Sequence, residues 1–497
     1  MNNKNEMDNA IIQTNAKKID SAQVGDLIIH GRTIKTPSFI HEIDGKEDAY
    51  SIFEHQKLIT EPHIIAFPAH RWMNLLRGYT RSSPKEKTKK VFSIYRNHHV
   101  LIYEAPEMFL HTMPFLLLKH GLSATGRGTR EFNKLMMIEN NKQGALKLLP
   151  EFERLFLESQ WDLLRYNTYK KWEKQELVSF DKVKDVPLQP KRIKNLDEVW
   201  KQTQQSAYGK HLVELIEESS KIPSSTIVTA VKPLLSTSDK LDRELVAAQN
   251  KQMLSLYEKY HPTNNAGRPW LHLFLNHTIF TEQGDTSIHN IIDEVVTPGI
   301  NPDRGNGHAG ICVTLTDWQK AWEIGTSRQN LEGFITDLGT IASQYKMPLY
   351  LARAKWIGEY LIDFGATLTG CMLNGHTKYT EENTGAPKID DPKRFGRVPL
   401  YGFCNEVFIN DLFNEGKKLG ELKGPKKLYH FDNIPDVCNT MLQYDHERFR
   451  CDFAKPRRIV THCSELKQMR DDLNLSKPNP GRNYIQRSLL WGGGKQD

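Results

Sequence analysis

The chain has 497 residues, of which 38% are hydrophobic and 26% are charged, and its formal net charge is +7. This composition is typical of a soluble globular protein with one large domain and insertions, or with two to three smaller domains. The 6 widely spaced cysteines exclude a disulfide scaffold, and no run of about 20 apolar residues exists to cross a membrane. Because the N-terminal segment also lacks an apolar signal core, we expect a cytoplasmic protein without a membrane partner.

Residues 1–20 are expected to form a polar tail, and residues 21–130 the first part of a barrel. The stretch "LIIHGRTIKTPSFI" (27–40) predicts an apolar strand, a turn at Gly31 and a second strand that begins at Thr36-Pro37. Further apolar runs at 62–67 and 98–103 predict two more strands of this first part.

Residues 131–265 are expected to form a large helical insertion. Apolar and aromatic residues recur there every three to four positions beside a Lys/Glu-rich face, most clearly over 148–177. Prolines interrupt this pattern at 183–192. We interpret the aromatic stripe as packing core rather than as a base-stacking platform.

Residues 266–430 alternate between strand and helix patterns and are expected to form the second part of the barrel. Amphipathic helices are predicted over 330–345 and 355–365. Such alternation predicts parallel strands with crossover helices, in a doubly wound sheet or, as the size favours, a TIM-barrel-like (β/α)8 fold. Residues 431–497 are expected to form a small C-terminal extension. The strands predicted in this part are "WLHLFL" (270–275), "GICVTL" (310–315), "MPLYLA" (347–352), "ATLTGCML" (366–373) and "VPLYGFC" (398–404).

Two stretches together resemble the tRNA-guanine transglycosylase superfamily, which exchanges guanine in nucleic acid for a 7-deazapurine on a modified TIM barrel. "GDLIIHGRTIKTPSFI" (25–40) is similar to the early hairpin of this family. "MPLYLARAKWIGEYLIDFGATLTGCMLNG" (347–375) is similar to the family's "PRYLMGVG", helix and "GxDxFDCxLPTR" stretch, with Cys371 and Leu373 among the matching residues. The resemblance implies a divergent branch, either a DNA deazaguanine transglycosylase or a transglycosylase-like protein of an antiphage operon of the CBASS kind.

The chain departs from the family's pattern at the expected catalytic residues. Gly370 stands where the resemblance places the nucleophilic aspartate, and a glycine cannot form a covalent intermediate. Asp317, after the strand at 310–315, is the better substitute, although it could equally cap the following helix; Asp363 is the other candidate. Glu104 is the counterpart of the family's second carboxylate and the expected general base.

Substrate contacts are expected from Gly- and Arg-rich loops at 121–130 and 301–310, although ordinary connections are the alternative interpretation. Basic clusters at 85–90, 416–427 and 455–458 would suit phosphate contacts, or form solvated surface. The implied partners are a 7-deazapurine base, an acceptor that is DNA, tRNA or a protein, and a second copy of the chain or an operon-encoded protein. The predicted substrate-binding residues are Arg127, Arg130, Arg304, Arg353 and Asn374.

A structural zinc ion is a further expectation, since the C-terminal extension contains Cys438, His446, Cys451 and Cys463. The family's own zinc spacing is absent, so buried cysteines without a metal are the alternative.

The function expected from the sequence is thus that of a transglycosylase-like protein that acts on or binds a guanine or 7-deazaguanine base. If active, it would be a pentosyltransferase in nucleic-acid modification or antiphage defence. The alternative is an inactive nucleobase- or nucleic-acid-binding subunit of a defence complex, and a third hypothesis is an unrelated barrel hydrolase with paired carboxylates.

Overall fold

The fold was analysed in a computed structural model of the whole chain. The described residues are, with short gaps, 12–43, 63–68, 98–103, 225–228, 267–300, 307–372, 397–399, 406–408 and 455–481, with isolated positions at 52, at 217 and between 243 and 259.

Eight strands form the central sheet, and every neighbouring pair among them is parallel. They are hydrogen-bonded in the closed order β10-β11-β4-β5-β6-β7-β8-β9, so that β11 returns to lie beside β4. The strands are β4 (Ser38–Glu42), β5 (Ile64–Pro68), β6 (His99–Tyr103), β7 (Ser225–Val228), β8 (Gly267–Leu275), β9 (Ile311–Leu315), β10 (Leu349–Ala352) and β11 (Leu368–Met372).

In the well-described connections after β8, β9 and β10, helices cover the outer face of the sheet. Alternate strand residues such as Leu273, Val313 and Leu351 point outward and share one apolar cluster with helix residues such as Phe334 and Leu338. The elements are η5 (His277–Phe280), α12 (Asp285–Ile291), η6 (Ile292–Val296) and α13 (Thr297–Ile300) after β8; α14 (Trp318–Glu323) and α15 (Gly325–Gln344) after β9; and α16 (Lys355–Tyr360) and η7 (Leu361–Phe364) after β10.

The chain therefore has an α/β fold with a curled parallel sheet, and the helices predicted over 330–345 and 355–365 are confirmed. The connections after β4, β5, β6 and β7 lie mostly outside the described residues.

The N-terminal hairpin closes one end of the ring. β2 (Ala22–Ile29) pairs antiparallel with β3 (Arg32–Thr36), a strand that the sequence analysis did not predict. The strand predicted to begin at Thr36-Pro37 is β4, which β3 enters through Pro37. Leu27 and Ile34 from this hairpin pack with side chains inside the ring that lie at the starts of the sheet strands, such as Leu368 at the start of β11. The hairpin therefore covers the amino-terminal end of the strands and leaves their carboxyl-terminal end as the place for ligand chemistry.

Two strands lie in ranges for which the sequence predicted something else. β1 (Ile12–Ile19) pairs antiparallel with β2, within the expected polar tail. Its residues are largely polar, so its sequence carries no apolar strand pattern. β7 lies within 131–265, the expected helical insertion, and its four residues are too few for a recognisable alternation.

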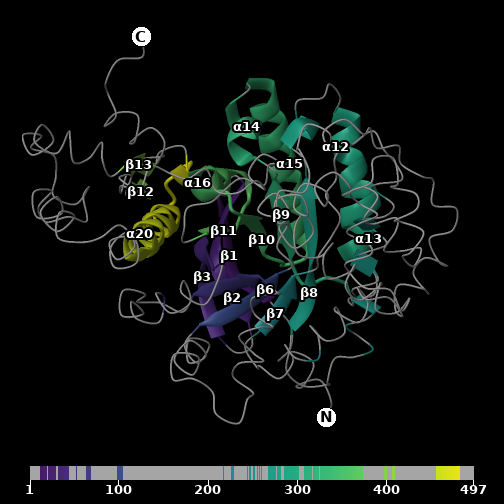
Figure 1. Cartoon of the computed structure of the whole chain (residues 1–497), viewed down its shortest axis with the longest axis horizontal. Helices are drawn as coiled ribbons and strands as arrows, with labels where there is room; N and C mark the ends of the chain where they lie inside the picture. Colours follow the sequence, from purple (N-terminus) through teal and green to yellow (C-terminus); the bar gives the residue numbers. More distant parts are fainter. Residues whose placement is uncertain are drawn as a thin grey trace, which may run out of the picture.

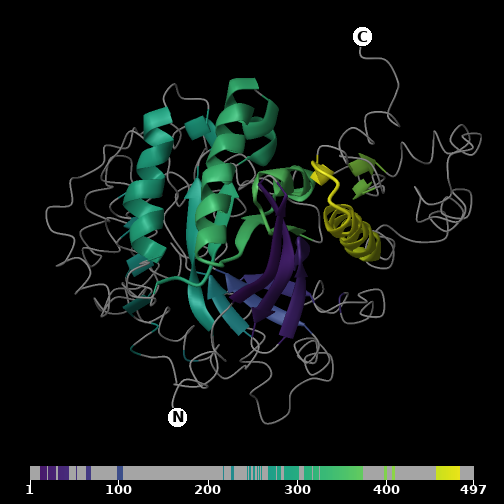
Figure 2. The same cartoon turned by 180° about the vertical axis from the view of Figure 1, so that it is seen from behind.

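The C-terminal helix α20 (Lys455–Asn474) lies on the outside of the barrel (Figures 1 and 2). It contacts β4. Its Leu466 and Met469 pack with Phe39 and Cys371 from the outer faces of β4 and β11. Arg470 donates from Nη1 to the carbonyl oxygen of Pro37 at 3.0 Å. A short antiparallel pair, β12 (Arg397–Pro399) and β13 (Glu406–Phe408), precedes this helix in sequence.

Across the described part of the chain, none of the helices is both long and apolar enough to span a membrane.

Candidate functional site

Three of the residues predicted for the site belong to the described part of the chain: Asp317, Arg353 and Cys463. Asp317 follows β9 and Arg353 follows the neighbouring strand β10, whereas Cys463 belongs to α20. The remaining predicted residues, Glu104, Arg127, Arg130, Arg304, Asn374, Cys438, His446 and Cys451, lie outside the described residues.

Asp317 caps a helix. It directly precedes α14, and its Oδ1 accepts the backbone N–H groups of Gln319 at 3.0 Å and Lys320 at 3.2 Å. These two bonds satisfy amides that have no partner inside the helix. The side chain is fully buried at the carboxyl end of β9. Asp363, the other carboxylate considered, accepts the backbone N–H of Gly481 at 2.8 Å.

Arg353 forms a buried ion pair with Glu42 inside the barrel. Its Nε lies 3.3 Å from Oε2 of Glu42, and the two side chains are 1% and 0% exposed. Oε1 of Glu42 also accepts the backbone N–H of Arg353 and the hydroxyl of Tyr350, each at 2.7 Å. Arg353 follows β10 with a φ of 57°, a left-handed conformation that this bond to its own N–H helps to hold.

Gly370 faces the same group from β11. A Cβ built on this glycine would lie 2.9 Å from the hydroxyl oxygen of Tyr350 and 3.1 Å from Oε1 of Glu42. It would also lie 2.8 Å from the carbonyl oxygen of Ile40 on the paired strand. The space that a side chain at position 370 would need is therefore filled by the Glu42 group, and glycine is required there for close packing.

A layer of side chains continues this interior site across β10, β9 and β8. Tyr350, Cys312 and His272 are aligned by strand register and point inward with the rest of the interior. Burial raises the pKa of the Cys312 thiol well above its ordinary value, and the Glu42 charge raises this pKa further, against a lowering by a hydrogen bond from Thr314. Cys312 is thus a neutral thiol and not an activated nucleophile. Nε2 of His272 lies 2.9 Å from Oγ1 of Thr314.

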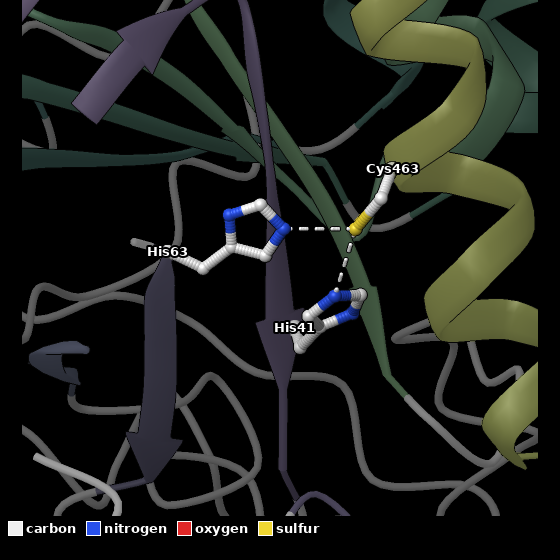
Figure 3. Close-up of side chains that lie close together, drawn as sticks. All are labelled: His41, His63 and Cys463. Atoms are coloured by element: carbon white, nitrogen blue, oxygen red, sulfur yellow. Dashed lines mark hydrogen bonds between the residues drawn. The ribbon is translucent and has the colours of Figure 1, made fainter. Parts of the chain in front are cut away.

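A second group, the His41–His63–Cys463 cluster, lies on the outer face of the barrel under α20 (Figure 3). Cys463 Sγ lies 2.9 Å from Nε2 of His63 and 3.4 Å from Nε2 of His41. His41 belongs to β4, His63 directly precedes β5, and Cys463 belongs to α20. Both histidines are buried, and the cysteine is half-buried.

His98 supports this cluster from the next strand. Its Nδ1 accepts the backbone N–H of His63 at 3.3 Å. Burial, and then the nearby His63 and Arg32, lower the pKa of His98 to about 4. Arg32 in turn donates to the carbonyl oxygen of His98. His98 is therefore neutral at physiological pH and fixes the backbone that carries His63.

The cluster could hold a metal ion. Its three ligand atoms lie within 4.8 Å of one another, and it is the only such group found among the described residues. Of the predicted metal ligands, only Cys463 is placed there, and its neighbours are His41 and His63, which the sequence-based prediction missed.

One strand, β4, contributes to both sites. His41 and Glu42 are consecutive, so their side chains point to opposite faces of the sheet, one toward α20 and one into the barrel. A histidine and a glutamate in the apolar context "SFIHEID" are the signal that could have identified both residues.

A search of protein-family models and of curated proteins found no match to this chain.

Proposed function

We propose that the protein is a transglycosylase-like (β/α)8 barrel that binds a guanine or 7-deazaguanine base at the carboxyl ends of its strands. Barrels of this kind build their ligand sites at that end from several strands. The closed order of eight parallel strands is consistent with this assignment. The stretch that resembles the transglycosylases, 347–375, includes β10, α16 and β11, next to the hairpin that carries the other resemblance.

The observation that carries the proposal is the Glu42 group opposite Gly370. Guanine presents hydrogen-bond donors on its Watson–Crick edge, and a fixed carboxylate is an acceptor for such donors. Glu42 is a buried carboxylate on an inward face, and the guanidinium of Arg353 lies beside it with Nε 3.3 Å from Oε2. Gly370 has no side chain for covalent chemistry, and Glu42 already accepts bonds from Tyr350 and Arg353. Because Gly370 supplies no nucleophile, this arrangement favours binding without base exchange.

The second candidate function is base exchange by a pentosyltransferase that uses Asp317 and Glu104. The position of Asp317 at the carboxyl end of β9 favours it, because barrel chemistry is built there. The capping bonds of Asp317 reduce its availability as a nucleophile. For both candidates we propose a role in nucleic-acid modification or antiphage defence, with a second copy of the chain or an operon-encoded protein as partner. The macromolecule that carries the base would be a nucleic acid or a protein.

Thermal unfolding of the full chain with guanine, 7-deazaguanine and adenine tests the binding proposal. A base at 100 times its dissociation constant stabilises the folded state by about 2.7 kcal/mol. We expect guanine and 7-deazaguanine to raise the melting temperature and adenine to leave it unchanged. Stabilisation by none of them, or equally by all three, would contradict the proposal.

Incorporation of labelled guanine into DNA and tRNA separates the two candidates. No incorporation is expected for a binding protein. Incorporation that is lost in Asp317→Asn, while that variant keeps the wild-type melting temperature, would establish the second candidate instead.

The proposal includes one structural zinc ion at the His41–His63–Cys463 cluster. Imidazole nitrogen and thiolate sulfur are the donors that zinc prefers, whereas magnesium and calcium prefer oxygen.

A further inference from the structure

We infer that the zinc ion of the His41–His63–Cys463 cluster is a clamp that fixes the C-terminal helix α20 to the outside of the barrel. The inference rests on the zinc of the proposed function and is independent of base binding. Its ligands come from β4, from the residue before β5 and from α20, so a single ion would join all three segments (Figure 3).

The distances in the cluster are close to those of a coordinated ion. Zinc–nitrogen bonds of about 2.0–2.1 Å and zinc–sulfur bonds of about 2.3 Å place tetrahedral N and S ligands roughly 3.6 Å apart. The observed separation from Cys463 Sγ is 3.4 Å to His41 and 2.9 Å to His63. Binding therefore requires the second pair to open by a fraction of an ångström, which a side-chain rotation can supply.

Hydrogen bonding by a neutral thiol does not account for both contacts of Cys463 Sγ with the two imidazoles. A cysteine has one S–H, so it can donate to only one of the two imidazole nitrogens that approach its sulfur. The opposite imidazole would have to donate to sulfur, a weak acceptor. A cation removes this mismatch, because a thiolate and two neutral imidazoles all direct lone pairs at it.

Neighbouring residues restrain the backbone and the rings of the two histidines. The backbone N–H of His63 is bonded to Nδ1 of His98 at 3.3 Å. Phe39 packs against the His41 ring with 5.2 Å between ring centroids. These contacts limit the orientations of the ligands before any ion binds.

The helix that the ion would hold is distant in sequence from its contacts on the barrel. Cys463 is separated from His63 by 400 residues and from His41 by 422. A link between such distant segments restricts the unfolded chain strongly and opposes detachment of the helix in the folded protein. Other contacts of α20 include the apolar cluster around Leu466 and Met469, and the bonds of Arg470 to the carbonyl oxygens of Lys35 and Pro37. Leu473 of α20 also packs with Ala22 and Val24 of β2.

Metal analysis of the full chain tests the site. We expect one zinc ion per chain after purification without chelators, and thiolate-to-cobalt charge-transfer and tetrahedral d–d absorption bands after replacement by Co²⁺. Cys463→Ser, His41→Ala and His63→Ala should each lose the zinc and the cobalt bands. Cys371→Ser and His272→Gln are the matched controls, since Cys371 packs in the same α20 contact but neither residue belongs to the cluster, and both should keep the metal.

Hydrogen exchange before and after chelation tests the clamp in the wild-type chain, so it does not depend on whether a variant folds. We expect exchange of the α20 amides to accelerate by about tenfold or more, while the α15 amides are unchanged. A chain that carries no zinc and gives no cobalt bands, three variants that retain the metal, or unchanged α20 exchange would each overturn the inference. Zinc-dependent protection of α20 in a protein that binds no base would support the clamp and refute only the base-binding proposal.

Discussion

Replacement of Arg353 by methionine should destabilise the protein strongly, because it leaves the Glu42 carboxylate buried without its cation. The two side chains are 1% and 0% exposed, and Nε lies 3.3 Å from Oε2. At that distance the attraction is about 5 kcal/mol for an effective dielectric constant of roughly 20. The backbone N–H of residue 353 and the Tyr350 hydroxyl remain as donors, so we expect a loss of about 3–5 kcal/mol in the free energy of unfolding.

Urea unfolding measures this loss, and an exposed ion pair provides the control. Lys35 and Asp26 lie 2.7 Å apart, closer than the buried pair, but the Lys35 side chain is 56% exposed. Lys35→Met should therefore change the free energy of unfolding by less than about 1 kcal/mol. A double variant, Glu42→Gln with Arg353→Met, should recover part of the stability. If Arg353→Met cost no more than Lys35→Met, the buried ion pair would not be the feature that organises the barrel interior.

Other substitutions test the remaining assignments. In a urea titration, Gly370→Ala should lower the free energy of unfolding by about 1–3 kcal/mol, because its Cβ would lie 2.8 Å from a backbone oxygen. Gly333→Ala should raise it by roughly 1 kcal/mol, because a Cβ on the exposed side of α15 would meet nothing within 4 Å. Equal effects of the two substitutions would refute the packing argument. Asp317→Ala should lower the free energy of unfolding by about 1 kcal/mol, whereas Asp317→Asn should lower it little, because asparagine can also cap the start of α14. A large loss in both variants would indicate a role of Asp317 beyond helix capping. Cys312 should resist alkylation at pH 8 until the protein unfolds, because burial raises the pKa of its thiol, and rapid labelling of the folded chain in a mass-spectrometric assay would contradict this.

The elements of the second half could be predicted from the sequence because they obey simple periodicities. β9 and β10 are buried on both faces and appear as short continuous apolar runs, and α15 has an apolar stripe against the sheet. The polar strand β1 and the four-residue strand β7 carry no such pattern, and their pairing with other strands is what defines them. These two strands could not be found without the tertiary structure.

The candidate site could be predicted only in part. The sequence predicts Asp317 as a residue at the carboxyl end of a strand, Arg353 as a substrate-binding residue and Cys463 as a metal ligand. Their partners could not be inferred, because Glu42 meets Arg353, and His63 meets Cys463, only through pairings across 311 and 400 residues. The histidines His41 and His63 lie in apolar runs, where a buried histidine is compatible with ordinary packing as well as with metal binding.

Calorimetric titration of the full chain with 7-deazaguanine is the most direct test of base binding in the barrel. We predict binding of one base per chain, no heat of binding with adenine, and an affinity lower by about tenfold or more in Glu42→Gln, since a hydrogen bond to a charged group contributes about 1.5–3 kcal/mol. Lys35→Met should bind the base as the wild-type protein does. Absence of binding, or an affinity for 7-deazaguanine that is the same in the wild type and in a folded Glu42→Gln variant, would contradict the proposal that this carboxylate receives the base.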